Sequence, residues 1–477
     1  MKNIILTANG TQKADLVLKN ASIVNVFTES IEVGDVAITD GKIVGIGRYE
    51  GKIEKDMTGR FVCPGFIDGH IHLESSMVTP SEFARAVIAH GTTAVITDPH
   101  EIANVAGCDG ITYMMQATKD LPLDVFFMVP SCVPATDLDE SGACLNADDI
   151  TPFYNDRRVL GLAEMMNAFG VNQADGSVLS KIKTTLEHDR IIDGHAPLLT
   201  GKELNAYAAA GIRSDHECSN IAEAKEKLSR GQWIMIREGT AAKNLQELMP
   251  LFEAPYYNRI LLVTDDKHPL DLLNDGHIDA IIRKAVHLGA DPIRAIKAGS
   301  LNAATYFGLR DTGAIAPGYD ADIVVLNDLT DLHVQEVYKQ GTLISERGQI
   351  TTAVNSNTDS IPERVIHSFH VEKITPEQLV IPKQGEHIRV IELHAGELLT
   401  SERTASWNTD TSAKDWADGI NPDDDIIKIV AIERHKNTGH LGKGFLGGYG
   451  LKKGAVATSI GHDSHNLVVA GTNDTDI

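Results

Sequence analysis

The chain has 477 residues, of which 42% are hydrophobic and 23% are charged, so it is long enough for a large core and for more than one domain. Its formal net charge of −23 disfavours nucleic acid and anionic membranes as partners, because both repel an acidic surface. No apolar run approaches the length that crosses a bilayer, and no secretory signal is recognised at the N-terminus. The five cysteines are scattered and odd in number, which favours a reduced, cytoplasmic protein.

Both ends of a long central region have the pattern of β-strands. Runs of β-branched residues recur there, separated by turn-forming residues. These β-rich segments are residues 14–26, 31–46, 321–326 and 334–344. We therefore expect one small flanking β domain, assembled from residues 1–62 and 312–355.

The central region, residues 63–311, alternates short apolar runs with stretches of helical periodicity. The apolar runs are 66–73, 93–97, 125–129, 159–163, 190–192, 212–214, 233–236 and 260–263, and helical stretches include 80–90, 175–186, 202–210 and 221–228. This alternation predicts an α/β fold, a closed TIM-like (β/α)8 barrel. An open doubly wound sheet is the alternative, but the glycine-rich turn expected after its first strand is not found there.

The pattern changes again after about residue 355. A polar, linker-like stretch at 355–360 precedes strand-like runs at 387–393, 426–432 and 467–469, and an acidic loop is expected at 410–425. We therefore expect a C-terminal, mostly-β domain over residues 356–477.

The first apolar run of the barrel carries two histidines at its end. Side chains alternate along a strand, so His70 and His72 project from the same side and form half of a metal site. The reactive groups of a (β/α)8 barrel lie at the C-terminal ends of its strands, and metal-capable residues also end the fourth, fifth, sixth and eighth runs. The candidate metal ligands are therefore His70, His72, Glu164, His195, His216 and Asp265.

Six ligands are too many for one tetrahedral ion and fit two ions that share a bridging group. Glu164 is the expected bridge, because its carboxylate has two oxygens on a flexible stem. Imidazole and carboxylate ligands without thiolates favour manganese, iron or zinc. A water between two such ions would be deprotonated near neutral pH, and Asp265 would exchange a proton with it. The pattern thus predicts metal-assisted hydrolysis at a carbon centre.

Several longer segments resemble the amidohydrolase superfamily and, within it, the bacterial adenine deaminases. The segments that carry the resemblance are PGFIDGHIHLESSMV (64–78), HGTTAVITDPHEIANVAG (90–107), GLAEMMN (161–167), DGHAP (193–197), SDHE (214–217), TDD (264–266) and GHDSHN (461–466). The H-x-H of the first segment is shared by the whole superfamily. Glu164 is more specific, since hydrolases of cyclic amides usually have a carboxylated lysine at that position.

The resemblance implies a hydrolase that converts adenine to hypoxanthine and ammonia, with a metal-bridging hydroxide attacking C6 of the purine. It implies two divalent ions, with Mn²⁺ or Fe²⁺ expected first and Zn²⁺ also open. Asp265 would move the proton to the departing amine, and Glu101 would protonate a ring nitrogen, with His100 beside it. A role for Glu101 as a structural loop residue stays open, as does the alternative that the substrate is a cyclic amide or another aminoazine.

The segment GHDSHN is far from the barrel in the sequence. One interpretation is a cap over the active-site mouth, in which His462 or His465 contacts substrate or metal; the other is a polar turn. The chain ends soon after it, whereas adenine deaminases extend further, which leaves open that the last domain is truncated. We further expect a cytoplasmic homo-oligomer with adenine as its small-molecule partner and with no nucleic acid or membrane partner.

Overall fold

The computed structural model describes residues 1–355, 361–395, 400–408 and 416–477. The chain divides into two compact units. The first, called here the barrel unit, consists of residues 1–99, 112–131 and 146–360, and the second, the C-terminal unit, of residues 100–111, 132–145 and 361–477. Most of the linker expected at 355–360, and the first part of the loop expected at 410–425, lie outside the described residues. The three-domain division expected from the sequence stays a prediction.

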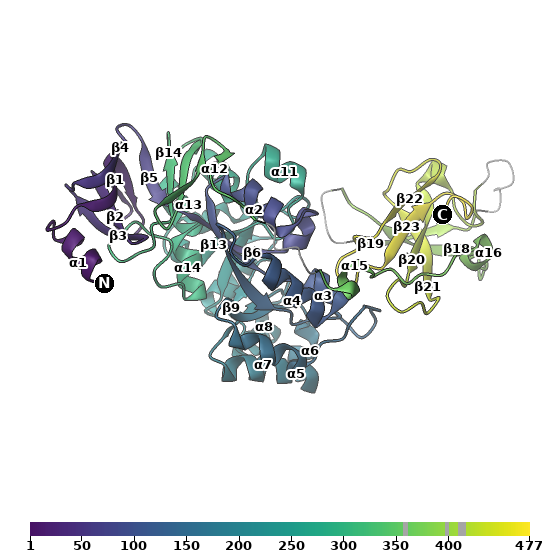
Figure 1. The fold of residues 1–477 in the computed structure, drawn as a ribbon. Coiled ribbons are helices and arrows are strands. Elements are labelled where there is room, and N and C mark those ends of the chain that lie inside the picture. The colour runs from purple at the N-terminus through teal and green to yellow at the C-terminus, as the bar shows by residue number, and fades with distance from the viewer. Residues whose placement is uncertain (356–360, 396–399, 409–415) are drawn as a thin grey trace. The chain divides into compact units, whose positions relative to one another are not determined.

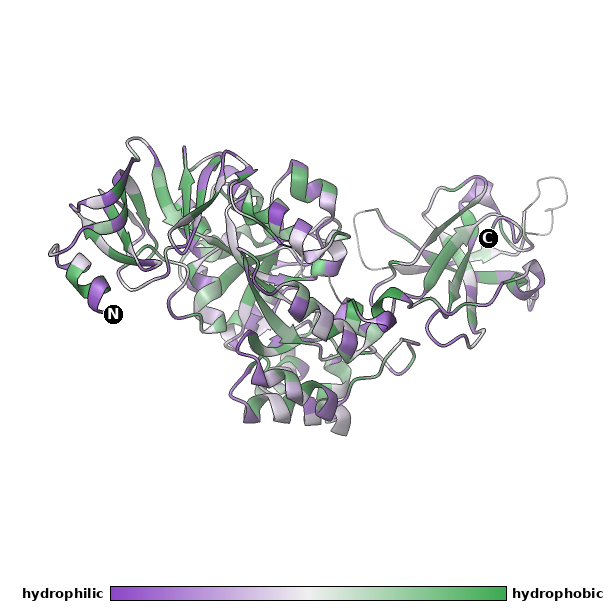
Figure 2. Cartoon of the chain, viewed as in Figure 1, coloured by the Kyte–Doolittle hydropathy of each residue, from purple (hydrophilic) through white to green (hydrophobic). Residues whose placement is uncertain are grey.

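Eight parallel strands form the centre of the barrel unit, and each predicted apolar run contributes one of them (Figure 1). Their bounds are β6 Phe66–Ile71, β7 Thr92–Thr97, β8 Asp124–Val129, β9 Val159–Met165, β10 Ile191–Gly194, β11 Ser214–Asp215, β12 Trp233–Arg237 and β13 Ile260–Val263. The strands are buried on both faces, which explains their continuous apolar sequences. In Figure 2 these strands are green, that is, hydrophobic, whereas the surrounding helices also carry hydrophilic residues, drawn in purple.

Hydrogen bonds at two edges close the eight strands into a barrel. The strands form a sheet of order β10-β9-β8-β7-β6 and a second of order β11-β12-β13. The Arg213 amide donates to the Ile192 carbonyl at 3.0 Å, and the Asp265 amide donates to the His70 carbonyl at 2.9 Å. Gly69 permits the second junction, because a Cβ there would lie 2.2 Å from Cδ1 of Leu261. The predicted (β/α)8 architecture is confirmed.

Amphipathic helices surround the strands. The helices of the barrel unit that bear on the site or cover the barrel are α2 Pro80–Ile88, α7 Gly176–Glu187, α8 Gly201–Ala209, α9 Ile221–Ser229, α12 Ile278–His287, α13 Pro292–Ala298 and α14 Leu301–Phe307. Local sequence sets several of their starts. The Asp175 carboxylate accepts hydrogen bonds from two amides in the first turn of α7, and the side-chain oxygen of Asn220 accepts one from the Glu223 amide in the first turn of α9.

The flanking sheet joins strands from both ends of the barrel sequence, as expected. Its order is β17-β16-β15-β14-β5-β1-β2-β3, with β4 paired to β1. The bounds are β1 Ala14–Asn25, β2 Ser30–Thr39, β3 Lys42–Gly47, β4 Gly51–Asp56, β5 Phe61–Pro64, β14 Ile323–Leu326, β15 Val334–Lys339, β16 Thr342–Glu346 and β17 Gln349–Ile350. Strand β14 runs antiparallel to β5, so the purple and green strands of Figure 1 form one sheet.

The C-terminal unit contains a six-stranded sheet of order β19-β18-β21-β20-β23-β22, which confirms its mostly-β character. The bounds are β18 His387–Glu392, β19 Ser401–Ser406, β20 Ile426–Ile432, β21 Leu441–Gly447, β22 Ala455–Thr458 and β23 Leu467–Gly471. The short helix α3 His100–Ala106 belongs to this unit, although it directly follows β7 and the Asp98-Pro99 pair in the chain. Among the described residues, no helix has the length and apolar composition needed to span a membrane.

Candidate metal centre

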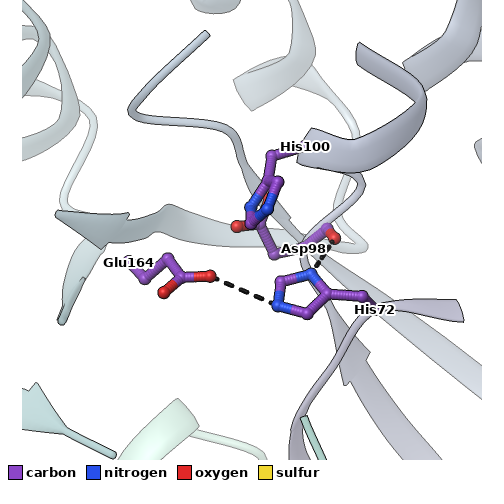
Figure 3. A group of neighbouring side chains, drawn as sticks. All are labelled: His72, Asp98, His100 and Glu164. Carbon is purple, nitrogen blue, oxygen red and sulfur yellow. Dashed lines mark hydrogen bonds and ion pairs between the residues drawn. The ribbon is translucent and has the colours of Figure 1, made fainter. Parts of the chain in front are cut away.

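The two histidines at the end of β6 face the same pair of carboxylates. The His72 Nε2 lies 3.2 Å from Oε1 of Glu164 and 3.1 Å from Oδ1 of Asp265. The His70 Nε2 lies 3.7 and 3.5 Å from the same two oxygens. The Nδ1 of His72 is 2.9 Å from the Asp98 carbonyl, to which it must donate (Figure 3). The Nε2 of His72 is therefore an acceptor that points at carboxylate oxygens.

The second oxygen of Glu164 faces a second pair of histidines. Glu164 lies near the end of β9, and its Oε2 is 2.6 Å from Nδ1 of His195 and 3.3 Å from Nε2 of His216. These two ring nitrogens are 3.2 Å from each other. His195 follows β10 and His216 follows β11, so the barrel brings the ends of four strands to one carboxylate.

Asp265 follows β13 and has an unusual backbone. Its φ of +59° lies in the left-handed region, which aspartate tolerates better than most residues. The backbone is fixed from both sides, because the Asp265 amide donates to the His70 carbonyl and the Asp265 carbonyl accepts from the His72 amide at 3.1 Å. The carboxylate therefore faces the H-x-H pair as a consequence of barrel closure.

Arg237, which the sequence did not indicate as a site residue, binds the other side of Asp265. The Nη1 of Arg237 lies 2.5 Å from Oδ2 of Asp265, and its guanidinium also makes a two-pronged ion pair with Glu217. Oε1 of Glu217 lies 3.3 Å from Nε2 of His216. Arg237 ends β12, the one strand of the second sheet to which no site residue was assigned. A basic residue at that strand end was the available signal.

Electrostatics favours ionised carboxylates throughout this centre. Burial alone would raise the pKa of Glu164, but the charges of His195 and His216 hold that pKa well below its usual value. Burial alone would also raise the pKa of Asp265, but the contacts of its carboxylate with His70 and His72, together with the charges of His216 and Arg237, hold that pKa well below its usual value. Three anionic side chains thus meet four imidazoles and one guanidinium inside the barrel.

A further shell of buried side chains holds the strand ends in place. Oδ1 of Asp68 accepts from the amides of His70 and Thr264, each at 3.2 Å, and its Oδ2 lies 2.9 Å from Nε2 of His277. Under the second histidine pair, Nζ of Lys227 lies 2.7 Å from Oδ2 of Asp215. Neither network was predicted. Asp68 and His277 are distant in the sequence, and Asp215 and Lys227 lie on different elements, β11 and α9.

The remaining predicted residues meet within the C-terminal unit. Glu101 lies in the first turn of α3, and its carboxylate is in direct contact with Nδ1 of His462 and Nε2 of His465. The Nε2 of His100 is 3.2 Å from Oε1 of Glu101. Burial raises the pKa of Glu101, but the charge of His100 and hydrogen bonds from the three histidines hold it well below its usual value.

Comparison with known families and folds agrees with this architecture. Residues 61–344 match the model of the amidohydrolase family, and residues 397–477 match the adenine deaminase C-terminal domain. Atrazine chlorohydrolase TrzN from Arthrobacter aurescens TC1, solved with zinc, has a TM-score of 0.54 at 16% identity, over 71% of this chain and 97% of that chain. Beta-aspartyl dipeptidase from Fervidobacterium islandicum AW-1 has a TM-score of 0.53 at 17% identity, over 71% and 98%. These likenesses show the shared fold.

Full-length relatives are much more similar. Adenine deaminase of Desulfatibacillum aliphaticivorans is 47% identical over 474 residues, which cover 99% of this chain and 82% of the relative. Adenine deaminase of Geobacillus kaustophilus is 45% identical over 478 residues, covering 100% and 82%. The chain therefore belongs to the amidohydrolase family. Within that family it belongs with the adenine deaminases.

Proposed function

We propose that this chain hydrolyses adenine to hypoxanthine and ammonia at a centre that holds two divalent cations. One observation carries the proposal: four imidazoles converge on the two oxygens of Glu164, a buried carboxylate at the end of a barrel strand. The 47% identity to a curated adenine deaminase over 99% of the chain supports adenine as the substrate.

The proposed ligands divide between two cations. His70, His72 and Asp265 would hold one cation, His195 and His216 the other, and Glu164 would bridge them. The donor atoms fit this assignment, because the acceptor Nε2 of His72 would otherwise face two ionised carboxylates. The Nε2 of His70 is buried without a hydrogen-bond partner among the described residues. The ligands favour manganese or iron, with zinc open, because they are imidazoles and carboxylates without thiolates.

Asp265 is proposed as the group that moves the proton at the reacting carbon. Two bound divalent cations would lower the pKa of a water molecule and so supply the nucleophile near neutral pH. Asp265 takes a proton from the attacking water and passes it to the departing amine. The contacts of its two oxygens support this role, because Oδ1 faces the histidine pair while Arg237 holds Oδ2.

Glu101 is proposed as the acid that protonates the purine ring. In the chain it follows the end of β7 by four residues, and the reactive groups of barrel enzymes lie on such loops. We propose that three histidines bind the substrate beside Glu101, since all three contact its carboxylate: His100, His462 and His465. We further propose a cytoplasmic homo-oligomer with a role in purine salvage.

A direct test compares the wild type with Glu164→Gln after loading with Mn²⁺, following both ammonia and hypoxanthine. Gln retains the size of Glu164 but removes the charge that two cations would share. We expect the wild type to bind two ions and to deaminate adenine, and kcat/KM of Glu164→Gln to fall by more than about 100-fold, since even outer partners of metal ligands contribute about 10–100-fold.

Glu187→Gln is the matched control, because Glu187 is exposed on α7 and its carboxylate lies 3.7 Å from Nζ of the likewise exposed Lys183. Its activity should equal that of the wild type. The contrary outcome is a wild-type protein that binds two ions, leaves adenine untouched and opens a dihydroorotate or hydantoin ring. That result would show that the substrate is a cyclic amide and not adenine.

A further inference from the structure

The carboxylate of Glu101 is enclosed by imidazoles from two segments that lie more than 350 residues apart in the chain. Oε1 contacts Nδ1 of His462 and Nε2 of His100, while Oε2 contacts Nε2 of His465. Only 3% of the Glu101 side chain is exposed, whereas 35% of the His462 side chain is exposed. His462 therefore joins a buried carboxylate to the solvent.

The turn that carries both histidines is held in a defined conformation. The His465 amide donates to the Gly461 carbonyl at 2.7 Å, which closes the turn. The Nε2 of His435 lies 2.7 Å from the Ser464 carbonyl, to which it donates. Nδ2 of Asn466 donates to the Glu140 carbonyl at 2.7 Å. These contacts all lie within the C-terminal unit and hold His462 and His465 against Glu101.

The proposed reaction removes a proton from Glu101 in every turnover. A C6–O bond forms and the C6–N bond to the amino group breaks, and hypoxanthine carries a hydrogen on ring N1 that adenine lacks. Of the two water protons, Asp265 passes one to the departing ammonia. The other is released to solvent when the C6 oxygen becomes a carbonyl. The N1 proton given by Glu101 leaves with the product, so Glu101 must take a proton from solvent before the next cycle.

We propose that His462 is the proton relay that reloads Glu101 from solvent, with His465 as the residue that positions the carboxylate. This inference rests on the proposed role of Glu101 as the ring acid. An imidazole suits the task, because it exchanges protons near neutral pH with both water and a carboxylate. The other groups that face the relay are His100 on α3 and Asp463, whose Oδ1 is 3.7 Å from Nε2 of His100.

Small-molecule rescue tests the relay. His462→Ala is assayed as the metal-loaded full chain in weakly buffered solution, then with increasing imidazole or 4-methylimidazole. We expect kcat to fall by about tenfold to a hundredfold, which is less than the full contribution of a general acid, about 10²–10⁴-fold, because His462 acts through Glu101. Added imidazole should restore kcat with saturation, while KM and the content of two metal ions stay near wild-type values. His462→Gln, which keeps a polar side chain but cannot relay a proton, should behave in the same way.

His387→Ala is the matched control, because His387 is an exposed histidine on β18 of the same unit. It should match the wild type at every buffer concentration. A loss in both His462 variants that imidazole does not restore would show a purely structural role, and undiminished kcat would show no role; either result overturns the relay. A third metal ion in the wild type that His462→Ala lacks would also overturn it, in favour of a metal site.

Glu101→Gln separates this inference from the proposed function. It should be inactive with or without imidazole, because the acid itself is missing. If Glu101→Gln deaminates adenine at the wild-type rate, the ring acid is misassigned and the relay falls with it. If the metal-loaded wild type has no adenine deaminase activity, the proposed function fails first.

Discussion

Arg237 connects the two histidine pairs of the candidate metal centre through its ion pairs. On one side it contacts Asp265, whose other oxygen faces His70 and His72; on the other it holds Glu217, which faces His216. The guanidinium is buried, and burial alone would lower the pKa of Arg237, but the charges of Asp265 and Glu217 raise it above its usual value. A permanent cation at this point orients both carboxylates without titrating near neutral pH.

Replacing Arg237 should affect turnover more than substrate binding. Arg237→Gln leaves two buried carboxylates without their cation, and the resulting shift of Asp265 should lower kcat by about 100-fold, the cost of a displacement near 1 Å at a reacting group. Arg237→Lys keeps the charge but loses the two-pronged geometry, so we expect a partial loss. Steady-state kinetics with adenine and metal analysis of each variant provide the measurement.

Arg157→Gln serves as the control, because Arg157 is exposed and precedes the start of β9, whereas Glu164 lies near the end of that strand. Equal kcat in Arg237→Gln, Arg157→Gln and the wild type would remove Arg237 from the catalytic arrangement.

At the level of single residues, the sequence predicted the site residues that two general rules cover. Strand alternation and the strand-end rule of barrels were sufficient to select His70, His72, Glu164 and Asp265. The sequence did not predict Arg237 as a site residue, because its role depends on which carboxylates surround it in three dimensions. His277 was not predicted for a similar reason, since its partner Asp68 lies about two hundred residues away in the chain.

At the level of elements, helix α9 supports the loops that present the second histidine pair. Nζ of Lys227 on α9 donates to the Ala196 carbonyl at 2.6 Å and contacts carboxylate oxygens of Asp215 and Glu223, each at 2.7 Å. His195 precedes Ala196 and His216 follows Asp215, so one buried ammonium ties the ends of β10 and β11 to the helix.

Lys227→Met should destabilise the barrel unit. The variant leaves buried carboxylates unpaired, and removing one partner of a buried ion pair costs about 3–5 kcal/mol. Denaturant unfolding of the metal-free protein measures the difference. Lys202→Met, an exposed lysine in the first turn of α8, should change the free energy of unfolding by less than about 0.5 kcal/mol. Equal unfolding midpoints for the two variants would show that the Lys227 network contributes little.

Element prediction succeeded where the chain is apolar and failed where pairing overrides propensity. All eight barrel strands lie at or beside predicted runs, although β11 begins at Ser214 and has only two residues. Strand β21 was missed because its sequence, LGKGFLG, is rich in glycine, which disfavours strands. It forms because β18 and β20 pair with it on both sides. Strand β19 was missed because SERTAS is polar, as suits a sheet edge.

At the level of the whole molecule, segments that pack together are often far apart in the sequence, so their contacts are hard to predict from it. The flanking sheet was predictable because strand-like sequence appears on both sides of the barrel region. The mostly-β character of the C-terminal unit was predictable too, but its full extent was not, since the unit includes residues 100–111 and 132–145 from within the barrel sequence. The contact of GHDSHN with Glu101 depends on that arrangement, which neither periodicity nor spacing could reveal.

Titration of the metal-free protein with Mn²⁺ tests most directly whether this chain is an adenine deaminase that works with two metal ions. Hypoxanthine and ammonia are measured at each addition, together with bound metal. We predict no turnover without metal, equal amounts of the two products, and activity that reaches its plateau at two ions per chain. A plateau at one ion per chain, full activity in the metal-free protein, or two bound ions without adenine turnover would contradict the account.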